Sequence, residues 1–107
     1  MNKLVRNGMV AVIYSPGFGG GWSTWNWDHP DCVFDREIAE QVLDREDPQA
    51  IERLAQAKWG RGDDYFFSGA AEELAVAWLP EGVRFVIREY DGNETVETEN
   101  DIEWLTA

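Results

Sequence analysis

The most apolar stretch of the chain, residues 9–14, is hydrophobic at every position and does not alternate with polar residues. Three of these positions are β-branched, and an unbroken apolar, β-branched run is typical of a strand buried on both faces. We therefore predict a central strand of a sheet, which Pro16 and the following glycines end.

Two later segments have apolar residues at helical spacing. Residues 35–46 predict one helix, for which Asp31 or Asp35 is in position to act as the N-cap. A second helix is predicted to run to about residue 58, with Asp47 as its N-cap and Pro48 at its first position. The residues expected to face the core are Ile38, Ala39, Val42, Leu43, Ile51, Leu54, Ala55 and Trp59.

The last third of the chain has the pattern of strands. Residues 72–79 and 82–90 are separated by Pro80 and Glu81, which predicts a hairpin. A second turn at 91–93 leads to a further strand at residues 95–99 and completes a three-stranded meander. Beyond it, we expect the two apolar side chains near the C-terminus, Ile102 and Trp104, to pack against the body.

The order strand, loop, helix, helix, meander predicts the α+β class. We expect one domain over residues 1–107, with two layers. Its mostly antiparallel, or mixed, sheet would have four or five strands, with both helices on one face.

The segment between the first strand and the first helix differs from the rest of the chain. Residues 15–27, here called the Gly/Trp loop, hold four of the ten glycines and three of the six tryptophans. Glycine lets a backbone approach a ligand closely, and tryptophan offers a large flat face, so we predict a binding site with at least one exposed indole. The candidate ligand- or partner-binding residues are Tyr14, Ser15, Gly17, Phe18, Gly19, Gly20, Gly21, Trp22, Ser23, Thr24, Trp25, Asn26, Trp27 and His29.

A glycine-rich turn between a strand and a helix favours binding of an anion by backbone N–H groups. This loop lacks the glycine spacing of dinucleotide sites and the Gly-Lys-Ser/Thr ending of nucleoside triphosphate sites. No lysine or arginine lies between Arg6 and Arg36. A small anionic, nucleotide-like ligand therefore stays an alternative, with indoles stacked on its ring and Arg84 or Arg88 assisting.

Chemically reactive residue types gather just after the loop, at Asp28, His29, Asp31 and Cys32. Their crowding within five residues, with no distant second cluster, does not fit a structural zinc site, so we predict no metal and no cofactor. We assign no catalytic residue. A hydrolase in which His29 acts with Asp28 or Asp31 is kept as a third hypothesis.

The net charge is −12, and it is unevenly placed. Residues 1–34 sum to zero, whereas residues 89–103 contain seven acids and no base. Such a surface repels nucleic-acid backbone, so we predict no direct binding of DNA or RNA; it serves solubility or attracts a basic protein. The single cysteine indicates a reducing compartment, and the longest apolar run is too short for a membrane span, so we expect a cytoplasmic protein.

Residues 10–25, VAVIYSPGFGGGWSTW, contain the pattern Ser-Pro-Gly-aromatic-Gly-x-Gly-Trp after a strand. With residues 78–82, Phe85, Ile87, and residues 89–92 and 103–104, this pattern resembles a family of small uncharacterised proteins of tailed phages and prophages. The resemblance implies a non-enzymatic binding protein that inhibits or modulates a host protein, in host takeover or anti-defence. The Gly/Trp loop would be its apolar anchor and the acidic segment would steer it; self-association stays open.

Overall fold

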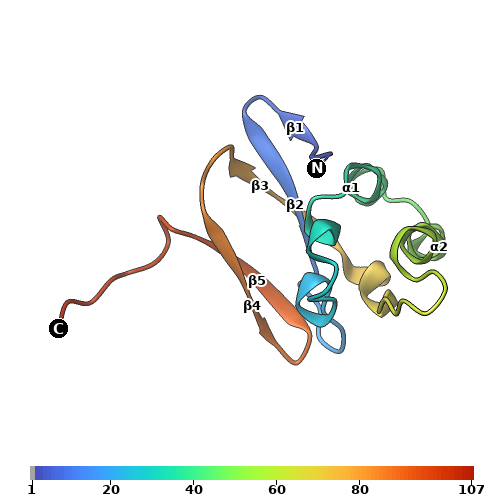
Figure 1. Ribbon diagram of the computed structural model, residues 1–107. Helices are drawn as coiled ribbons and strands as arrows, with labels where there is room; N and C mark the ends of the chain where they lie inside the picture. Colours follow the sequence, from blue (N-terminus) through green and yellow to red (C-terminus); the bar gives the residue numbers. More distant parts are fainter. Residues whose placement is uncertain (1) are drawn as a thin grey trace.

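The computed structural model describes residues 2–107, and its central element is strand β2, Met9–Tyr14 (Figure 1). β2 pairs antiparallel with β1, Val5–Arg6, on one side and with β3, Ala75–Pro80, on the other. Residues 10–13 are all buried, because both faces of β2 are covered. The prediction of a central, doubly buried strand is confirmed.

The short hairpin formed by β1 and β2 is an addition to the predicted elements. Asn7 and Gly8 form its turn, with φ angles of 53° and 75°. Asn-Gly is the dipeptide that most strongly favours a two-residue turn with positive φ at both positions. The sequence therefore contains a direct signal for this hairpin.

The helices α1, Arg36–Leu43, and α2, Pro48–Trp59, lie on one face of the three-stranded sheet (Figure 1). As predicted, Asp35 and Asp47 are the N-caps, and their carboxylates accept hydrogen bonds from N–H groups of the first turns at 3.0 and 2.9 Å. The main core between the helices and β2 includes Ala11, Ile13, Ile38, Ala39, Ile51 and Ala55. Within residues 2–107, neither helix is long and apolar enough to cross a membrane.

A separate hairpin covers the opposite face of β2. It consists of β4, Phe85–Tyr90, and β5, Asn93–Thr98. Phe85 packs edge-on against Phe34 with ring centroids 5.9 Å apart, and both rings border the same small hollow as Val12. The side chains of β2 that point away from the helices are therefore covered by this hairpin.

The predicted hairpin at Pro80 and Glu81 is wrong, and so is the three-stranded meander. β3 pairs with β2 along its whole length and not with β4. The Val83 N–H donates to the Pro80 carbonyl at 3.1 Å, in a turn that leads the chain out of the sheet. β2 has backbone hydrogen-bonding groups at both edges and apolar side chains on both faces. β3 pairs with one edge of β2, and β4 instead places Phe85 near the face of β2 that carries Val12.

The predicted α+β class is confirmed, since residues 2–107 form two α-helices and five strands with antiparallel pairing. The strands form two sheets of three and two, where one sheet was expected. The helices, the three-stranded sheet and the hairpin make three layers in place of the predicted two.

Candidate functional site

A buried carboxylate, that of Glu94, lies inside the Gly/Trp loop. Glu94 is only 2% exposed, and its Oε1 accepts a hydrogen bond from the Ser15 N–H at 2.8 Å. Its Oε2 accepts from the N–H groups of Trp22 at 2.9 Å and Thr24 at 3.1 Å. The Thr24 hydroxyl donates to the same oxygen at 2.5 Å. All of these partners are donors, which is the arrangement that offsets the cost of burying a negative charge.

The Gly/Trp loop is therefore an anion-binding loop whose anion belongs to the same chain. Backbone N–H groups form the predicted cradle, but they belong to Ser15, Trp22 and Thr24 and not to the glycines between them. Glu94 supplies the negative charge that an external phosphate or carboxylate would otherwise bring. A small anion can enter this cradle only if Glu94 leaves it.

The turn between β4 and β5 closes over the same loop. The Gly19 N–H donates to the Asp91 carbonyl at 2.7 Å, and a second backbone hydrogen bond of 2.7 Å joins β5 to the start of the loop. Gly92 has a φ of 85°, and a Cβ placed on it would overlap the backbone of Gly20. Glycine is required at position 92 both for this conformation and for the close contact of the two backbones.

We expect Gly92→Ala to lower the free energy of unfolding by about 2–4 kcal/mol, because a side chain there is strained and separates the hairpin from the loop. Gly82→Ala is the matched control. Gly82 has a similar φ of 88°, and its Cβ would meet nothing within 4 Å. Urea unfolding should show a loss of about 1–2 kcal/mol for the control. Equal losses in the two variants would show that the contact between hairpin and loop contributes nothing.

Trp22 is part of the core and is fully buried. Its Nε1 donates to the Cys32 carbonyl at 2.8 Å, and its ring packs edge-on against Phe66 and Trp59 at 5.1 and 6.2 Å. In this conformation Trp22 offers no surface to a ligand or partner. It anchors the middle of the Gly/Trp loop in the core, while other residues of the loop reach the surface.

The buried polar side chains of the loop also hold it in place. Asn26 donates from Nδ2 to the carbonyls of Trp22 at 2.8 Å and Phe67 at 2.9 Å, and its Oδ1 accepts from the Phe67 N–H at 2.7 Å. The Ser15 hydroxyl donates to the Gly20 carbonyl at 2.9 Å. These residues fix the loop to its neighbours, and their polar groups are not available to a ligand.

Exposed and half-buried aromatic side chains occur in this fixed loop and in the two segments that contact it. We call the set Phe18, Trp25, Trp27, Phe67 and Tyr90 the aromatic surface. Trp27 is 83% exposed, Tyr90 78%, Phe18 66% and Trp25 40%. The half-buried Phe67 packs against Trp25 at 4.9 Å. The expectation of at least one exposed indole in the loop is confirmed by Trp25 and Trp27.

The aromatic surface comes from three segments of the chain. Phe18 precedes Gly19, whose N–H is bonded to the carbonyl of Asp91, the residue after Tyr90. The Phe67 ring lies against Gly20. Strand β4 also contacts the short 3-10 helix η1, Ser23–Trp25. The loop, the segment at residue 67 and the hairpin turn therefore meet at one place.

The remaining candidate residues have varied surroundings. Tyr14 is half-buried and borders a groove between β3 and β5. Gly17 lies against the carboxylate of Glu73. Ser23 is half-buried, and its carbonyl accepts the Asn26 N–H at 3.1 Å. Gly17 and Ser23 belong to the Gly/Trp loop, and Tyr14 directly precedes it.

The residues considered for metal binding or catalysis do not assemble into a reactive site. His29 Nε2 is buried, lies 3.6 Å from Asp28 Oδ2 and has no hydrogen-bond partner among the described residues. Burial raises the pKa of the Cys32 thiol far above its usual range, and the Glu94 carboxylate adds to this rise. Cys32 therefore stays a protonated core residue. Residues 2–107 contain no group of three or more side chains placed to hold a metal ion.

The acidic segment 89–103 is less uniform than its sequence suggests. Apart from the buried Glu94, several of its carboxylates have partners within the chain. Glu89 accepts from the Gly92 N–H at 2.8 Å, and Asp101 accepts from the Thr98 N–H at 2.9 Å. This hydrogen bond lowers the pKa of Asp101. The unpaired negative surface charge of this segment thus comes from exposed acids such as Asp91.

The arginines that were considered as ligand contacts lie on the outer face of the hairpin. Arg84 Nε is 3.5 Å from Glu99, and Arg88 Nε is 2.7 Å from Glu97. Since β-strand side chains alternate, this face is opposite the one that carries Glu94. Neither arginine assists the Gly/Trp loop.

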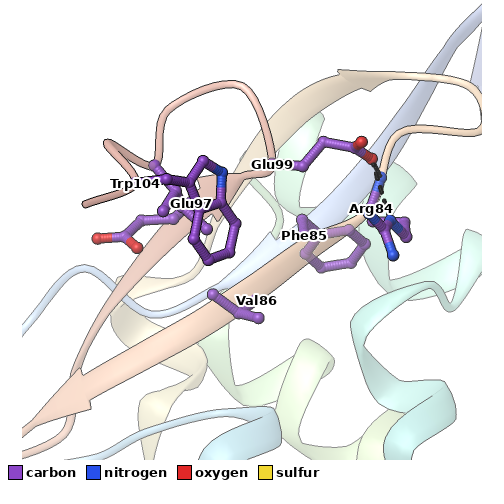
Figure 2. A pocket seen from close by; sticks show the side chains of 7 residues that line it. Arg84, Phe85, Val86, Glu97, Glu99 and Trp104 are labelled. Carbon is purple, nitrogen blue, oxygen red and sulfur yellow. Dashed lines mark hydrogen bonds and ion pairs between the residues drawn. The ribbon is translucent and has the colours of Figure 1, made fainter. Parts of the chain in front are cut away.

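This outer face carries a hollow of about 290 Å³. Figure 2 shows the side chains around it, with the ion pair of Arg84 and Glu99 at one end. Trp104 borders the hollow but is 78% exposed, so the prediction that it packs firmly against the body is wrong. The half-buried Ile102 makes the closer contact.

Glu94 and two residues of the aromatic surface, Phe67 and Tyr90, were not among the predicted site residues. A signal for Glu94 was present, because it is in phase with Val96 on β5 and therefore points to the same inner face. The predicted cradle was a second signal, because its N–H groups require a hydrogen-bond acceptor. No lysine or arginine lies between Arg6 and Arg36 to attract an external anion, so an acidic side chain of the same chain was the natural acceptor. Tyr90 precedes the Asp-Gly turn, whose docking brings the adjacent backbone of Asp91 to Gly19, and it lies in phase with Arg88 on β4.

The chain matches no family model, and comparison with curated proteins and with solved structures found no match.

Proposed function

We propose that this is a non-enzymatic binding protein that attaches to another protein through the aromatic surface. Following the resemblance to small phage proteins, the partner would be a bacterial host protein in the cytoplasm, which is inhibited or modulated by the contact. The observation that supports this proposal is the exposure of Trp25, Trp27, Phe18 and Tyr90 around a loop fixed by the buried Glu94.

Large exposed aromatic side chains on a rigid framework suit a protein interface. Tryptophan and tyrosine are frequent hot-spot residues, because they bury much apolar area at little cost in side-chain entropy. The hydrogen bonds of Glu94 hold the loop before any partner arrives, so little ordering is needed on binding. A fixed loop is thus expected to bind more tightly than a mobile one.

The alternative of a small anionic ligand has less support, because Glu94 fills the cradle and both hairpin arginines are paired elsewhere. A hydrolase based on His29 has less support still, since its buried Nε2 lies 3.6 Å from the Asp28 carboxylate and has no hydrogen-bond partner within residues 2–107. Adding nucleotides should therefore leave the thermal unfolding temperature unchanged.

The proposal is tested by capture of host proteins on the immobilised chain, followed by affinity measurement with the partner that mass spectrometry identifies. We expect Trp27→Ala and Trp25→Ala each to weaken binding about tenfold or more, as hot-spot residues do. Trp104→Ala is the control, because Trp104 is equally exposed but lies outside the aromatic surface. Unchanged affinity in both loop variants would overturn the proposal.

A further inference from the structure

We infer that the aromatic surface binds an arginine-bearing segment of a protein partner, with the guanidinium stacked on the indole of Trp27 and paired with a neighbouring carboxylate. This inference rests on the proposed function and names the chemistry of the partner.

The first observation is the sign of the charge. The exposed acids Asp28 and Asp91 directly follow Trp27 and Tyr90, and the Glu73 carboxylate lies against Gly17. The chain has no lysine or arginine between Arg6 and Arg36, so the loop itself brings no positive charge. A cation is attracted to this surface, and an acidic segment is repelled.

The second observation is the kind of apolar surface. The most exposed hydrophobic side chains here are the rings of Trp27, Tyr90 and Phe18. The face of an aromatic ring carries negative electrostatic potential and attracts cations, and tryptophan does so most strongly. Aromatic faces beside carboxylates are thus complementary to a cation more than to an aliphatic side chain.

The third observation is that the cations for which the structure describes a partner are engaged away from the Gly/Trp loop. Lys3 lies over the Phe34 ring at 4.3 Å, and Arg6 lies over Trp78 at 5.7 Å. Arg36 and Lys58 pair with acids at the helices, at 2.8 and 2.7 Å. The same stacking occurs within this fold, and Trp27 is left exposed for a cation from outside.

Arginine suits this surface better than lysine. Its planar guanidinium stacks on a ring with one face and still directs N–H groups sideways to a carboxylate. Asp28 follows Trp27 in the chain and both are exposed, so the binding that we infer places the guanidinium on the indole and directs its N–H groups to this carboxylate. A lysine ammonium is a compact, strongly hydrated charge and gains less from the flat indole.

The test uses three short synthetic peptides of alternating sequence: arginine with glycine, lysine with glycine, and citrulline with glycine, the last being a neutral isostere of the first. Binding to the full chain is measured by isothermal titration calorimetry. We expect the arginine peptide to bind about fivefold more tightly than the lysine peptide, and the citrulline peptide to give no measurable heat. Added salt should weaken the binding.

Variants of the protein test whether the arginine peptide binds at Trp27 and Asp28. Trp27→Ala and Asp28→Asn should each weaken binding of the arginine peptide about fivefold. Their controls, Trp104→Ala and Glu103→Gln, alter an exposed indole and an exposed acid in the C-terminal segment and should leave it unchanged. Equal binding of the citrulline peptide, or no effect of Trp27→Ala, would overturn the inference.

The outcomes separate this inference from the proposed function. If a captured partner depends on Trp27 but the arginine peptide does not bind, the partner chemistry is wrong and the proposed function stands. If the arginine peptide binds at Trp27 while capture of the partner is insensitive to Trp25→Ala and Trp27→Ala, the proposed function falls.

Discussion

Replacing Glu94 with alanine is expected to lower the free energy of unfolding by about 3–5 kcal/mol, because it leaves buried N–H donors without an acceptor. The donors are the backbone N–H groups of Ser15, Trp22 and Thr24. A loss of this size is a large part of the stability of a small domain. Urea unfolding followed by circular dichroism measures it.

Two further variants make the result interpretable. Glu94→Gln keeps the shape of the side chain but turns one acceptor into a donor, so we expect an intermediate loss of about 2 kcal/mol. Glu97→Gln, on the same strand, alters only the surface pair with Arg88 and should cost less than about 1 kcal/mol. If Glu94→Ala were no more destabilising than Glu97→Gln, the buried carboxylate would not hold the loop.

Acetate provides an independent check on the cradle. Alanine at position 94 removes the carboxylate and leaves space beside the N–H groups, which then resemble an empty anion site. We expect added acetate to raise the thermal unfolding temperature of Glu94→Ala and to leave the original protein unchanged, because Glu94 fills its cradle. Glu94→Gln should not respond, since the amide side chain occupies the space.

Trp22→Ala is expected to be the most destabilising change within the Gly/Trp loop, with a loss of about 3–5 kcal/mol. Trp22 is fully buried, packs against Phe66 and Trp59, and donates its indole N–H to Cys32. Alanine leaves a cavity and an unpaired carbonyl. The free energy of unfolding in urea is again the quantity to measure.

The matched control for Trp22→Ala is Trp27→Ala, five residues away in the same loop. Because the Trp27 indole is 83% exposed, its removal should change stability by less than about 0.5 kcal/mol. Similar losses in the two variants would contradict the division of the loop into a buried anchor and an exposed indole. Trp22→Phe, which keeps a ring but loses the N–H, should fall between them.

How much of the site could be predicted depends on the residue. The glycines of the loop indicated an N–H cradle, and the density of tryptophans indicated an exposed indole. The sequence could not indicate which indole is buried, because Trp22 and Trp25 have similar neighbours. That choice follows from the packing of Trp22 against Phe66, a residue brought there by the fold.

The predicted acidic face shows why the count of acids in a sequence overstates the number of free carboxylates. Counting charges along residues 89–103 treats each carboxylate as solvated. On β5, however, alternate side chains point to opposite faces, so Glu94 turns inward while Glu97 stays outside with Arg88. Register along a strand, and not the number of acids, decides which carboxylates remain free to meet a partner.

By itself, the sequence determined the features that depend on near neighbours. The caps Asp35 and Asp47 bond to N–H groups two or three residues on, and the Asp91–Gly92 turn and buried β2 follow equally from local pattern. The tertiary structure alone decided that β3 joins β2 and that Glu94 bonds to Trp22 and Ser15, 72 and 79 positions away. Such distant contacts depend on which apolar faces must be covered together, a property of the whole chain.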